Sequence, residues 1–296
     1  MEVLPFAVGD RGAPQWESGV AANPVIRAAT SPPAPFLCWQ LWDDPRMSDE
    51  VRYERQGAAA VLTIDRPQRR NAVDAATAAA LRRGLEEFEA DEAARVLVLT
   101  GAGGEAFCAG ADLKAMDLDV DHPGGPMGFT RLTPAKPAIA AIEGWCLAGG
   151  LELALWCDLR IATPDSVFGC FERRWGVPLI DGGTQRLPRV VGLGRALEMI
   201  LSGRAVEAEE AHRVGLVNEL AQPGRHLERA LDWAERIAGF PQETMLSDRR
   251  AALAGIGRPL DEGLALEHRL GREVLEVAAR GAARFAAGEG RHGDGA

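Results

Sequence analysis

The sequence predicts an α/β fold, and three observations support this prediction. Short apolar runs rich in valine, isoleucine and leucine recur between residues 59 and 163, and such runs are typical of buried strands. Helix-like segments separate several of these runs, which indicates strands joined by right-handed crossovers. From about residue 190 onward, the pattern of apolar residues is helical.

The first part of this pattern alternates between strand and helix. Residues 59–64, AAVLTI, predict one buried strand, and residues 95–101, RVLVLTG, predict another that ends at a glycine. Between them, residues 74–90 predict an amphipathic helix, because apolar side chains recur there at three- and four-residue spacing.

The next part repeats the alternation. Residues 137–144, PAIAAIEG, predict a strand, and residues 151–158, LELALWCD, predict a helix. Residues 159–163, LRIAT, predict a strand, and residues 166–172, SVFGCFE, predict a further extended segment. The helices expected after these lie at 192–202, 207–214, 224–239 and in stretches from 241 to about 287.

The two ends of the chain differ in composition from its middle. Residues 1–46 hold seven of the 18 prolines and no periodic pattern, so we predict a disordered extension there, with Met47 as a possible start of the functional chain. We expect a core at 47–240 and a helical region at 241–296, whose glycine-rich end GEGRHGDGA is frayed.

The overall charge and the cysteines limit the class of protein. A net charge of −10 disfavours binding to nucleic acid or to an anionic membrane. The five cysteines form no CxxC pair and indicate reduced, buried thiols of a cytoplasmic protein, although a nucleophilic cysteine stays an alternative. The histidines fit no zinc motif, so no metal site is expected. The N-terminus is acidic and no uncharged stretch is long enough to span a bilayer, so no targeting or membrane-spanning segment is expected. The cysteines are Cys38, Cys108, Cys146, Cys157 and Cys170.

Two glycine-bearing segments are candidates for binding an anion. Gly149 and Gly150 lie where a strand's exit loop becomes a helix, and a helix start offers unpaired N–H groups. Gly110 precedes Ala111 and Asp112 at a second expected helix start. Two such starts can each direct one N–H group at the same carbonyl oxygen, although tight packing is the alternative.

Two carboxylates are candidates for acid–base chemistry. Glu152 falls in the first turn of an apolar helix, and burial there is expected to raise its pKa. Compensation of the helix dipole is the alternative. Glu172 is the second candidate, and an ion pair with Arg173 or Arg174 is its alternative.

Several motifs occur together in order and resemble the enoyl-CoA hydratase/isomerase (crotonase) superfamily. The matching stretches are DRPQRRNAV at 65–73, AFCAGADLKAM at 106–116, KPAIAAIEGWCLAGGLELALWCDLRIA at 136–162, FGCFERRWGVPLIDGGTQRLPRVVG at 168–192 and A…GLVNEL at 211–220. Together the resemblance covers roughly residues 48–287.

The resemblance implies a fold, a site and an activity. It implies a crotonase-like spiral of repeated ββα units with a helical C-terminal region. The family's oxyanion-hole amides correspond to Ala111 and Gly149, and its two catalytic glutamates to Glu152 and Glu172, which lie 20 residues apart as in its hydratases. The implied activity is hydration of a 2-enoyl-CoA to a 3-hydroxyacyl-CoA, as in β-oxidation of fatty acids.

The resemblance also implies how coenzyme A is bound and how chains assemble. Coenzyme A enters as part of the substrate, so no separate cofactor is expected, and relatives form homotrimers or homohexamers. Asp112 also fits a helix cap. The residues implied for the nucleotide are Arg66, Arg69, Arg70, Asp112, Leu113 and Lys114.

Two departures from the family pattern keep other readings open. The stretch between Met116 and Lys136 is shorter than in typical hydratases, in which a helix covers the acyl site. Glu172 also lacks the usual preceding proline. The alternatives are an isomerase or acyl-CoA hydrolase on the same fold, and a non-catalytic acyl-CoA binder. A dinucleotide-dependent oxidoreductase is a further alternative, because G-x-G-x-x-A occurs at Gly101, Gly103 and Ala106.

Overall fold

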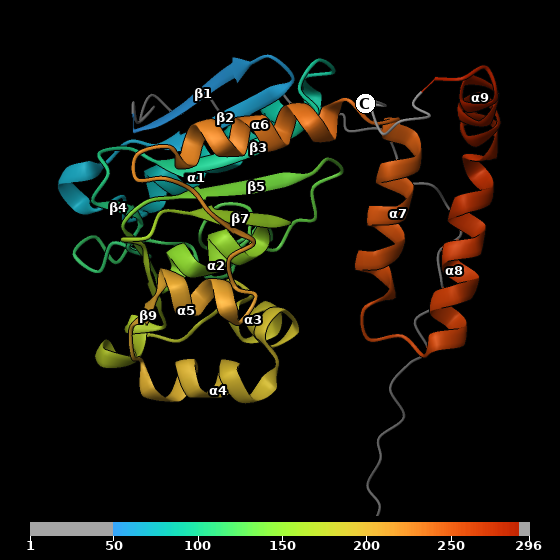
Figure 1. Ribbon diagram of the computed structural model, residues 1–296. Helices are drawn as coiled ribbons and strands as arrows, with labels where there is room; N and C mark the ends of the chain where they lie inside the picture. Colours follow the sequence, from blue (N-terminus) through green and yellow to red (C-terminus); the bar gives the residue numbers. More distant parts are fainter. Residues whose placement is uncertain (1–49, 290–296) are drawn as a thin grey trace, which may run out of the picture. The chain divides into compact units, whose positions relative to one another are not determined.

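The main sheet has six strands within residues 50–289, the part of the chain that this computed structural model describes (Figure 1). Only β1 is antiparallel to its neighbour, and the other strands run parallel. The order is β1 (Val51–Gln56), β2 (Ala59–Ile64), β3 (Val96–Gly101), β5 (Ala138–Ile142), β7 (Leu159–Ala162) and β10 (Glu219–Leu220).

A second, smaller sheet takes one strand from each repeat of the chain. Each of β3, β5 and β7 in the main sheet is followed by a strand of the second sheet, and those three strands are parallel to one another. The chain therefore winds between two sheets as a spiral, which confirms the fold that the resemblance implies. The order in the second sheet is β4 (Ala106–Cys108), β6 (Trp145–Leu147), β8 (Val167–Gly169) and β9 (Val206–Glu207).

The helices lie between and after the strands. The early helices are α1 (Ala75–Ala90), α2 (Gly149–Trp156), α3 (Gly183–Val191), α4 (Leu193–Ser202), α5 (Ala208–Arg213) and α6 (His226–Ala238). The C-terminal ones are α7 (Gln242–Gly255), α8 (Leu260–Glu273) and α9 (Leu275–Ala286), and two short 3₁₀ helices are η1 (Pro67–Arg69) and η2 (Phe171–Trp175).

Both faces of the main sheet are buried, and strand β3 shows how. Val96 and Val98 pack in a cluster with residues of α6, which covers that face (Figure 1). Leu97 and Leu99 point the other way into a larger cluster with residues of α1, α2 and the second sheet. A strand covered on both sides needs a continuous apolar run instead of alternation, which is why its sequence is so easily recognised.

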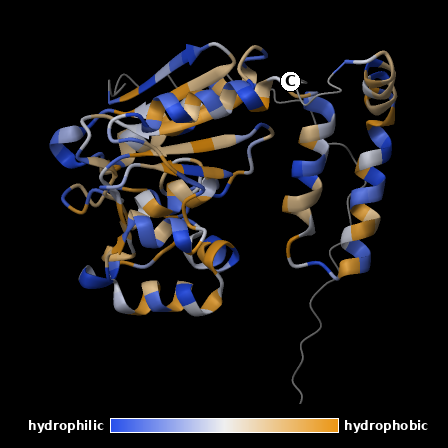
Figure 2. Ribbon diagram, viewed as in Figure 1, coloured by the Kyte–Doolittle hydropathy of each residue, from blue (hydrophilic) through white to orange (hydrophobic). Residues whose placement is uncertain are grey.

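Most of the expected elements are confirmed, but several short strands, the edge strand β1 and the helix α3 were missed. The edge strand β1 reads VRYERQ, and its hydrophilic colour in Figure 2 contrasts with the apolar strands beside it. An edge strand with one solvated face carries charges, so no apolar run marks it. Helix α3 was missed because it begins at a glycine pair and contains Pro188. The expected extended segment 166–172 was wrong beyond Gly169, because Glu172 lies in η2.

A half-buried arginine ties the C-terminal helices to the core. Arg249 of α7 pairs with the Asp158 carboxylate at 3.0 Å and donates to the Pro134 carbonyl at 2.9 Å. The domain boundary expected after residue 240 stays a prediction. The expected N-terminal extension, Met47 and most of the glycine-rich end lie outside the described residues.

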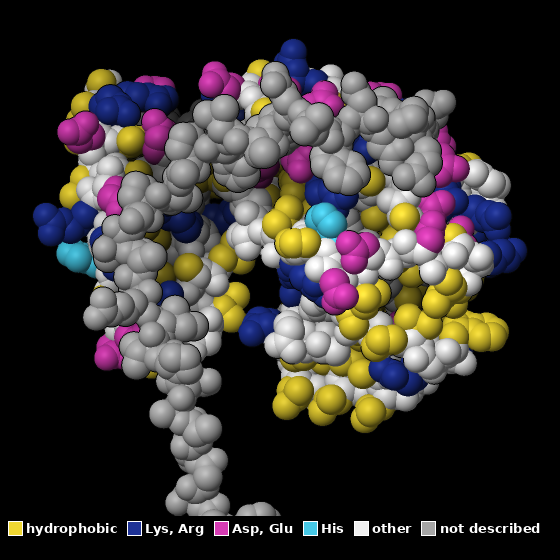
Figure 3. Space-filling view, turned by 180° about the vertical axis from the view of Figure 1, so that it is seen from behind, with side chains coloured by type: hydrophobic (Ala, Val, Ile, Leu, Met, Phe, Trp, Pro, Cys, Tyr) yellow, Lys and Arg dark blue, Asp and Glu magenta, His cyan; other side chains and the backbone are white. Residues whose placement is uncertain are grey.

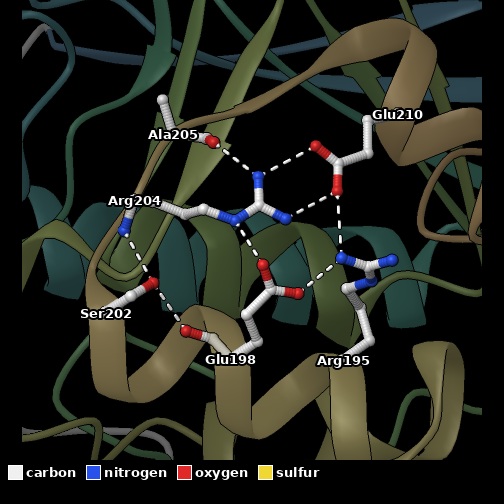
Figure 4. A network of polar contacts seen from close by, with 6 residues as sticks. All are labelled: Arg195, Glu198, Ser202, Arg204, Ala205 and Glu210. Carbon is white, nitrogen blue, oxygen red and sulfur yellow. Dashed lines mark hydrogen bonds and ion pairs between the residues drawn. The ribbon is translucent and has the colours of Figure 1, made fainter.

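A polar network joins α4 to α5 on the surface (Figure 4). The Arg204 guanidinium bridges the Glu198 carboxylate at 2.7 Å and the Glu210 carboxylate at 2.6 Å, and Arg195 pairs with both acids. These side chains are partly exposed, so each ion pair contributes little to the free energy of unfolding. Together, the ion pairs hold the segment between the two helices in one conformation.

We expect Gly150→Ala to destabilise the fold severely, because α2 packs directly on β4 at this residue. A Cβ atom on Gly150 would lie 2.0 Å from the Cys108 carbonyl oxygen, a backbone atom that has no room to move. We expect a loss of about 3 kcal/mol or more in the free energy of unfolding. Gly194→Ala is the matched control, since it also lies in a helix and has nothing within 4 Å. Urea denaturation followed by circular dichroism should leave the control unchanged or more stable, and equal losses in both variants would contradict this account.

Candidate active site

A cavity of about 370 Å³ opens where the β6–α2 turn, the loop after β4 and η2 meet. Its walls are mostly apolar, and its charged lining residues, Asp112, Glu152 and Glu172, are all acidic. Ala111 and Gly149 line it as well, so the structure brings the four predicted site residues together. The larger apolar lining side chains include Leu113, Met116, Leu147, Phe171, Trp175 and Ile180.

Glu152 is positioned by the first turn of α2 and by backbone amides from another segment. The residue is 3% exposed, and every residue of α2 from Gly150 onward is buried. One carboxylate oxygen, Oε1, accepts hydrogen bonds from the Asp181 amide at 2.9 Å and from the Gly183 amide at 2.7 Å. The other carboxylate oxygen accepts no hydrogen bond from any residue within 50–289. Glu152 is thus held by its α2 backbone and by the 181–183 loop.

The pKa of Glu152 is raised to about 8. Burial is the largest cause, and the negative charges of Asp181 and Glu172 add to it, while the amides of Gly183 and Asp181 oppose it. A carboxyl group with a pKa in this range exchanges protons near neutral pH, which is what general acid–base chemistry requires.

The side-chain carboxylate of Glu172 is buried without a hydrogen-bond partner from another described residue. The residue is 5% exposed, and both of its carboxylate oxygens are buried and unpaired. Burial raises the pKa of Glu172, while the backbone amide of the same residue and the nearby charge of Arg173 oppose this shift. A buried carboxyl group without donors favours its protonated form.

The ion-pair alternative for Glu172 was wrong. Arg173 donates instead to the Ile200 carbonyl, and Arg174 donates to the Gly203 carbonyl while stacking 3.6 Å from the Phe171 ring. Neither arginine therefore pairs with the Glu172 carboxylate, and Glu172 lines the cavity.

The Ala111 and Gly149 amides lie on two backbone segments in close contact. A Cβ atom on Gly110 would lie 3.0 Å from the Gly149 nitrogen and 2.9 Å from the Ala148 Cβ atom, so only glycine fits there. Ala148, which precedes α2, has a φ of 52°, a strained value for a residue with a side chain. Neither the Ala111 nor the Gly149 amide donates to an acceptor within the described residues. Such free amides beside a cavity can bind a carbonyl oxygen or an anion.

The helix expected to start at Gly110 is absent from the structure. Ala111 instead forms an isolated parallel bridge with Val73, and a turn follows. The Asp112 carboxylate accepts from the Lys114 amide at 3.0 Å, which closes a turn and does not cap a helix. The Ala111 amide is therefore oriented by the bridge to Val73.

The structure places Arg66 in a buried cluster of charges, and its contact with a nucleotide stays a prediction. Arg66 is 6% exposed and pairs with Glu50 at 2.7 Å, Asp74 at 2.7 Å and Asp112 at 3.5 Å. It also donates to the Ala72 carbonyl. With three acidic partners, Arg66 braces the loops that carry Ala111. Asp112 is part of this cluster through its ion pair with Arg66.

The other residues predicted for the nucleotide lie on the surface. Arg69 and Lys114 are exposed and have no ion pair among the described residues. Arg70 is exposed and pairs with Glu105 at 2.7 Å. Leu113 is 41% exposed and lines the cavity. Their contact with a nucleotide stays a prediction.

Sequence reasoning missed the segment that supports Glu152. Asp181 and Gly183 lie within the 168–192 stretch that resembles the family. The aromatic residues Phe171 and Trp175 of the cavity wall were also missed as contact residues. The available signal was an acidic residue beside a glycine pair in LIDGGT.

The competing chemistries find little support in the structure. Burial raises the pKa of the Cys108 thiol to about 12 and also raises the pKa of the Cys146, Cys157 and Cys170 thiols, so these groups stay protonated. Cys38 lies outside the described residues. Strand β4, not a helix, follows the glycines at 101–104, which excludes the dinucleotide fingerprint. Within residues 50–289, no group of three metal-binding side chains is assembled and no helix is long and apolar enough to cross a membrane.

The raised pKa of Glu152 predicts a pH-dependent gain in stability for Glu152→Gln. Below pH 4.5 the carboxyl group is protonated in both the folded and unfolded states, and its burial then carries no ionic cost. The cost develops as the pH rises from 4.5 to about 8 and reaches an upper bound on the order of 5 kcal/mol. Glutamine keeps the acceptor oxygen, so the variant should exceed the wild type in unfolding free energy by more at pH 9 than at pH 5.

Urea denaturation at both pH values measures this difference. Glu54→Gln on exposed strand β1 is the control, because that side chain is not buried. A gap between Glu152→Gln and wild type that is the same at both pH values would contradict the prediction.

Comparison with known proteins agrees with this geometry. The enoyl-CoA hydratase/isomerase family model matches residues 54–289. A probable enoyl-CoA hydratase of Rhizobium meliloti is 41% identical over 223 residues, which cover 73% of this chain and 86% of that protein. A crotonyl-CoA hydratase of Syntrophomonas wolfei is 36% identical over 227 residues, which cover 74% of this chain and 87% of that protein.

A solved structure agrees as well. The crystal structure of an enoyl-CoA hydratase from Mycobacterium marinum superposes with a TM-score of 0.77 at 39% identity, covering 81% of this chain and 96% of that one. The family match, the sequence identity and the fold all agree, and so this chain belongs to the enoyl-CoA hydratase/isomerase family, the crotonase superfamily.

Proposed function

We propose that the protein is an enoyl-CoA hydratase that adds water across the C2=C3 double bond of a 2-enoyl-CoA. The observation that carries this proposal is the meeting of two buried glutamates and two free amides in one apolar cavity. Related proteins named enoyl-CoA hydratase support the same reaction. The pairing of two carboxyl groups favours hydration over isomerisation, for which one proton carrier is enough.

The amides act on the thioester carbonyl. The carbonyl oxygen accepts hydrogen bonds from the Ala111 and Gly149 amides, which draws electron density from C3 of the enoyl group. When water adds at C3, negative charge moves to this oxygen, and the two donors stabilise it in surroundings of low polarity. Removing a donor of this kind typically lowers kcat by about 10²–10³-fold.

The glutamates divide the proton transfers. Glu152 takes a proton from water in its ionised form, which the two amides on its Oε1 stabilise against the effect of burial. The water oxygen then bonds to C3, and Glu172, which has no such donors, delivers its proton to C2. The product is a 3-hydroxyacyl-CoA, and transfer of a proton from Glu152 to Glu172 through solvent restores the starting state.

Coenzyme A is proposed to enter as part of the substrate, and no separate cofactor is required for these steps. The exposed Arg69 and Lys114 are the cations proposed to meet its phosphates. The reduced, buried thiols support the proposed cytoplasmic location.

The chain is proposed to form a homotrimer or homohexamer, the assembly that the family resemblance implies. Apolar side chains gather at the lower edge of the view in Figure 3, where α4 exposes Leu193, Leu197 and Leu201 on one face. Helix α8 similarly exposes Leu260 and Leu264. Exposed apolar stripes of this kind are typical of subunit contacts. Light scattering of the purified chain measures its mass in solution.

The decisive experiment is turnover of crotonyl-CoA and of a long-chain 2-enoyl-CoA, followed by loss of the conjugated thioester absorbance. The proposal expects hydration of at least one substrate, with a 3-hydroxyacyl-CoA identified by mass spectrometry. A product with a shifted double bond would indicate an isomerase, and release of free coenzyme A would indicate a hydrolase. Tight binding of acyl-CoA without any product would indicate a non-catalytic binder.

A further inference from the structure

Asp181 is a buried carboxylate that the proposed chemistry does not use. It lies between η2 and α3 and is 4% exposed. It does not line the cavity itself, although its neighbour Ile180 does. A buried carboxylate is costly unless its partners repay the loss of hydration, so its contacts indicate what it does.

The Asp181 side chain holds a segment that forms one wall of the cavity. We call residues 117–131 the strap, and in the structure they form turns and no helix. The Asp181 Oδ1 atom accepts from the Met127 amide at 3.0 Å and from the Thr130 hydroxyl. The strap contributes Leu118, Val120 and Pro126 to the cavity lining.

Two arginines reinforce the same junction. Arg186 of α3 donates to the Asp181 carbonyl at 3.0 Å and to the Thr130 carbonyl at 2.6 Å. Arg131 of the strap reaches the Ile180 carbonyl at 3.5 Å. The strap is therefore joined to the loop around Asp181 through both side-chain and backbone groups.

The backbone of the same residue holds Glu152. The Asp181 amide donates to Glu152 Oε1 at 2.9 Å, and the Gly183 amide donates to the same oxygen at 2.7 Å. One residue thus contacts the strap through its carboxylate and Glu152 through its amide. Movement of the strap would reach Glu152 through this one residue.

We propose that Asp181 is a positioning residue that sets the cavity wall and the orientation of Glu152 together, an inference that rests on the proposed hydratase function. In place of a helix over the acyl site, this chain has the short strap, and Asp181 anchors it. A change in the position of the strap against a bound acyl group is thereby transmitted to Glu152, the carboxylate that activates water.

The charge of Asp181 gives the proposal a distinctive readout. Glu152 is faced by Asp181, by Glu172 and Cys170 around η2, and by Arg186 of α3. Asp181 itself is faced by Arg131 and Arg186. Its negative charge helps to raise the pKa of Glu152, so removing that charge should lower this pKa.

Asp181→Asn and Asp181→Ala separate charge from anchoring. Asparagine keeps an acceptor for the Met127 amide and the Thr130 hydroxyl, so KM should hardly change. On its acidic side, kcat/KM falls with decreasing pH because Glu152 becomes protonated. This acidic limb should move to lower pH by roughly half a unit or more. Alanine also releases the strap, and kcat/KM should fall by about tenfold or more with a raised KM.

Two further variants guard against a purely structural explanation. Thr130→Val removes one donor from the strap but leaves Asp181 in place, and it should raise KM. This variant replaces Asp181→Ala as the test of anchoring if Asp181→Ala fails to fold. Asp158→Asn removes a carboxylate that accepts from the Ala138 amide and pairs with Arg249 away from the cavity. It should lower stability without moving the pH profile.

The outcomes separate this inference from the proposed function. The inference is overturned if the wild type is active, Asp181→Asn has the wild-type pH profile and Thr130→Val has the wild-type KM. That result leaves the hydratase proposal intact. A wild type inactive on every 2-enoyl-CoA at every pH overturns the hydratase proposal and the inference with it. Hydrogen exchange of the strap amides, faster in Asp181→Ala than in Asp181→Asn, supports the anchoring part directly.

Discussion

Glu172→Gln is expected to lower kcat for crotonyl-CoA hydration by about 10²–10⁴-fold, the contribution typical of a general acid. The substitution changes little else, because neither carboxylate oxygen of Glu172 has a hydrogen-bond partner in the described protein. Glutamine has the same shape and fits the same buried space, but it has no proton to deliver to C2. The affinity for the product should therefore stay within about threefold of the wild-type value, since only the transition state loses an interaction.

Glu152→Gln should reduce kcat by a similar factor for a different reason. Glutamine still accepts the hydrogen bonds of the Asp181 and Gly183 amides, but it cannot take a proton from water. Because both glutamates serve one reaction step, the double variant should be only slightly worse than either single variant. Stopped-flow absorbance and product analysis measure these rates, with Glu54→Gln on exposed β1 as the control. A fully active Glu172→Gln would mean that Glu172 is structural and that a one-glutamate reaction takes place.

The parts of the site that were predictable from sequence are those that local patterns specify. The apolar run around Glu152 indicates a buried helix, and a lone carboxylate within it is conspicuous. Gly149 and Gly150 indicate close backbone contacts at the start of that helix, and the structure has them. The α/β alternation was predictable for the same reason, since buried parallel strands form continuous apolar runs.

The parts that the sequence did not reveal depend on residues far apart in the chain. Arg66 looks like a surface cation in its own segment, and only the fold brings Glu50, Asp74 and Asp112 to it. Once Asp112 is engaged by Arg66, the backbone after Ala111 turns instead of starting a helix. Sequence patterns describe neighbours in the chain, so they do not reveal a cluster assembled from four segments.

The surroundings of Glu172 and Asp181 were hidden for related reasons. The alternation in SVFGCFE favours a strand, but the strand ends at Gly169 and η2 follows. Asp181 holds the strap through contacts about fifty residues distant in sequence. Both features appear only when the loops after β4 and β8 are placed side by side at the cavity.

Gly110→Ala is expected to lower kcat on the order of 10²-fold by displacing the two proposed carbonyl-binding amides from each other. The added Cβ atom would lie 2.9 Å from the Ala148 Cβ atom and 3.0 Å from the Gly149 nitrogen. Both neighbours belong to the rigid start of α2, so relief has to come from a shift between the segments carrying Ala111 and Gly149. Such a shift moves at least one amide away from the position of the developing negative charge.

The matched control separates this collision from backbone strain. Gly110 has a φ of +98°, which disfavours any side chain, and Gly224 has a φ of +73° with nothing within 4 Å. Gly224→Ala should therefore lose about 1 kcal/mol or more of stability through the same left-handed strain, yet keep its kcat. Measuring kcat beside the urea midpoint for both variants assigns the effect. If the two variants lose stability equally and both keep their kcat, the contact at Gly110 does not set the amide geometry, and the oxyanion role of Ala111 and Gly149 loses its structural basis.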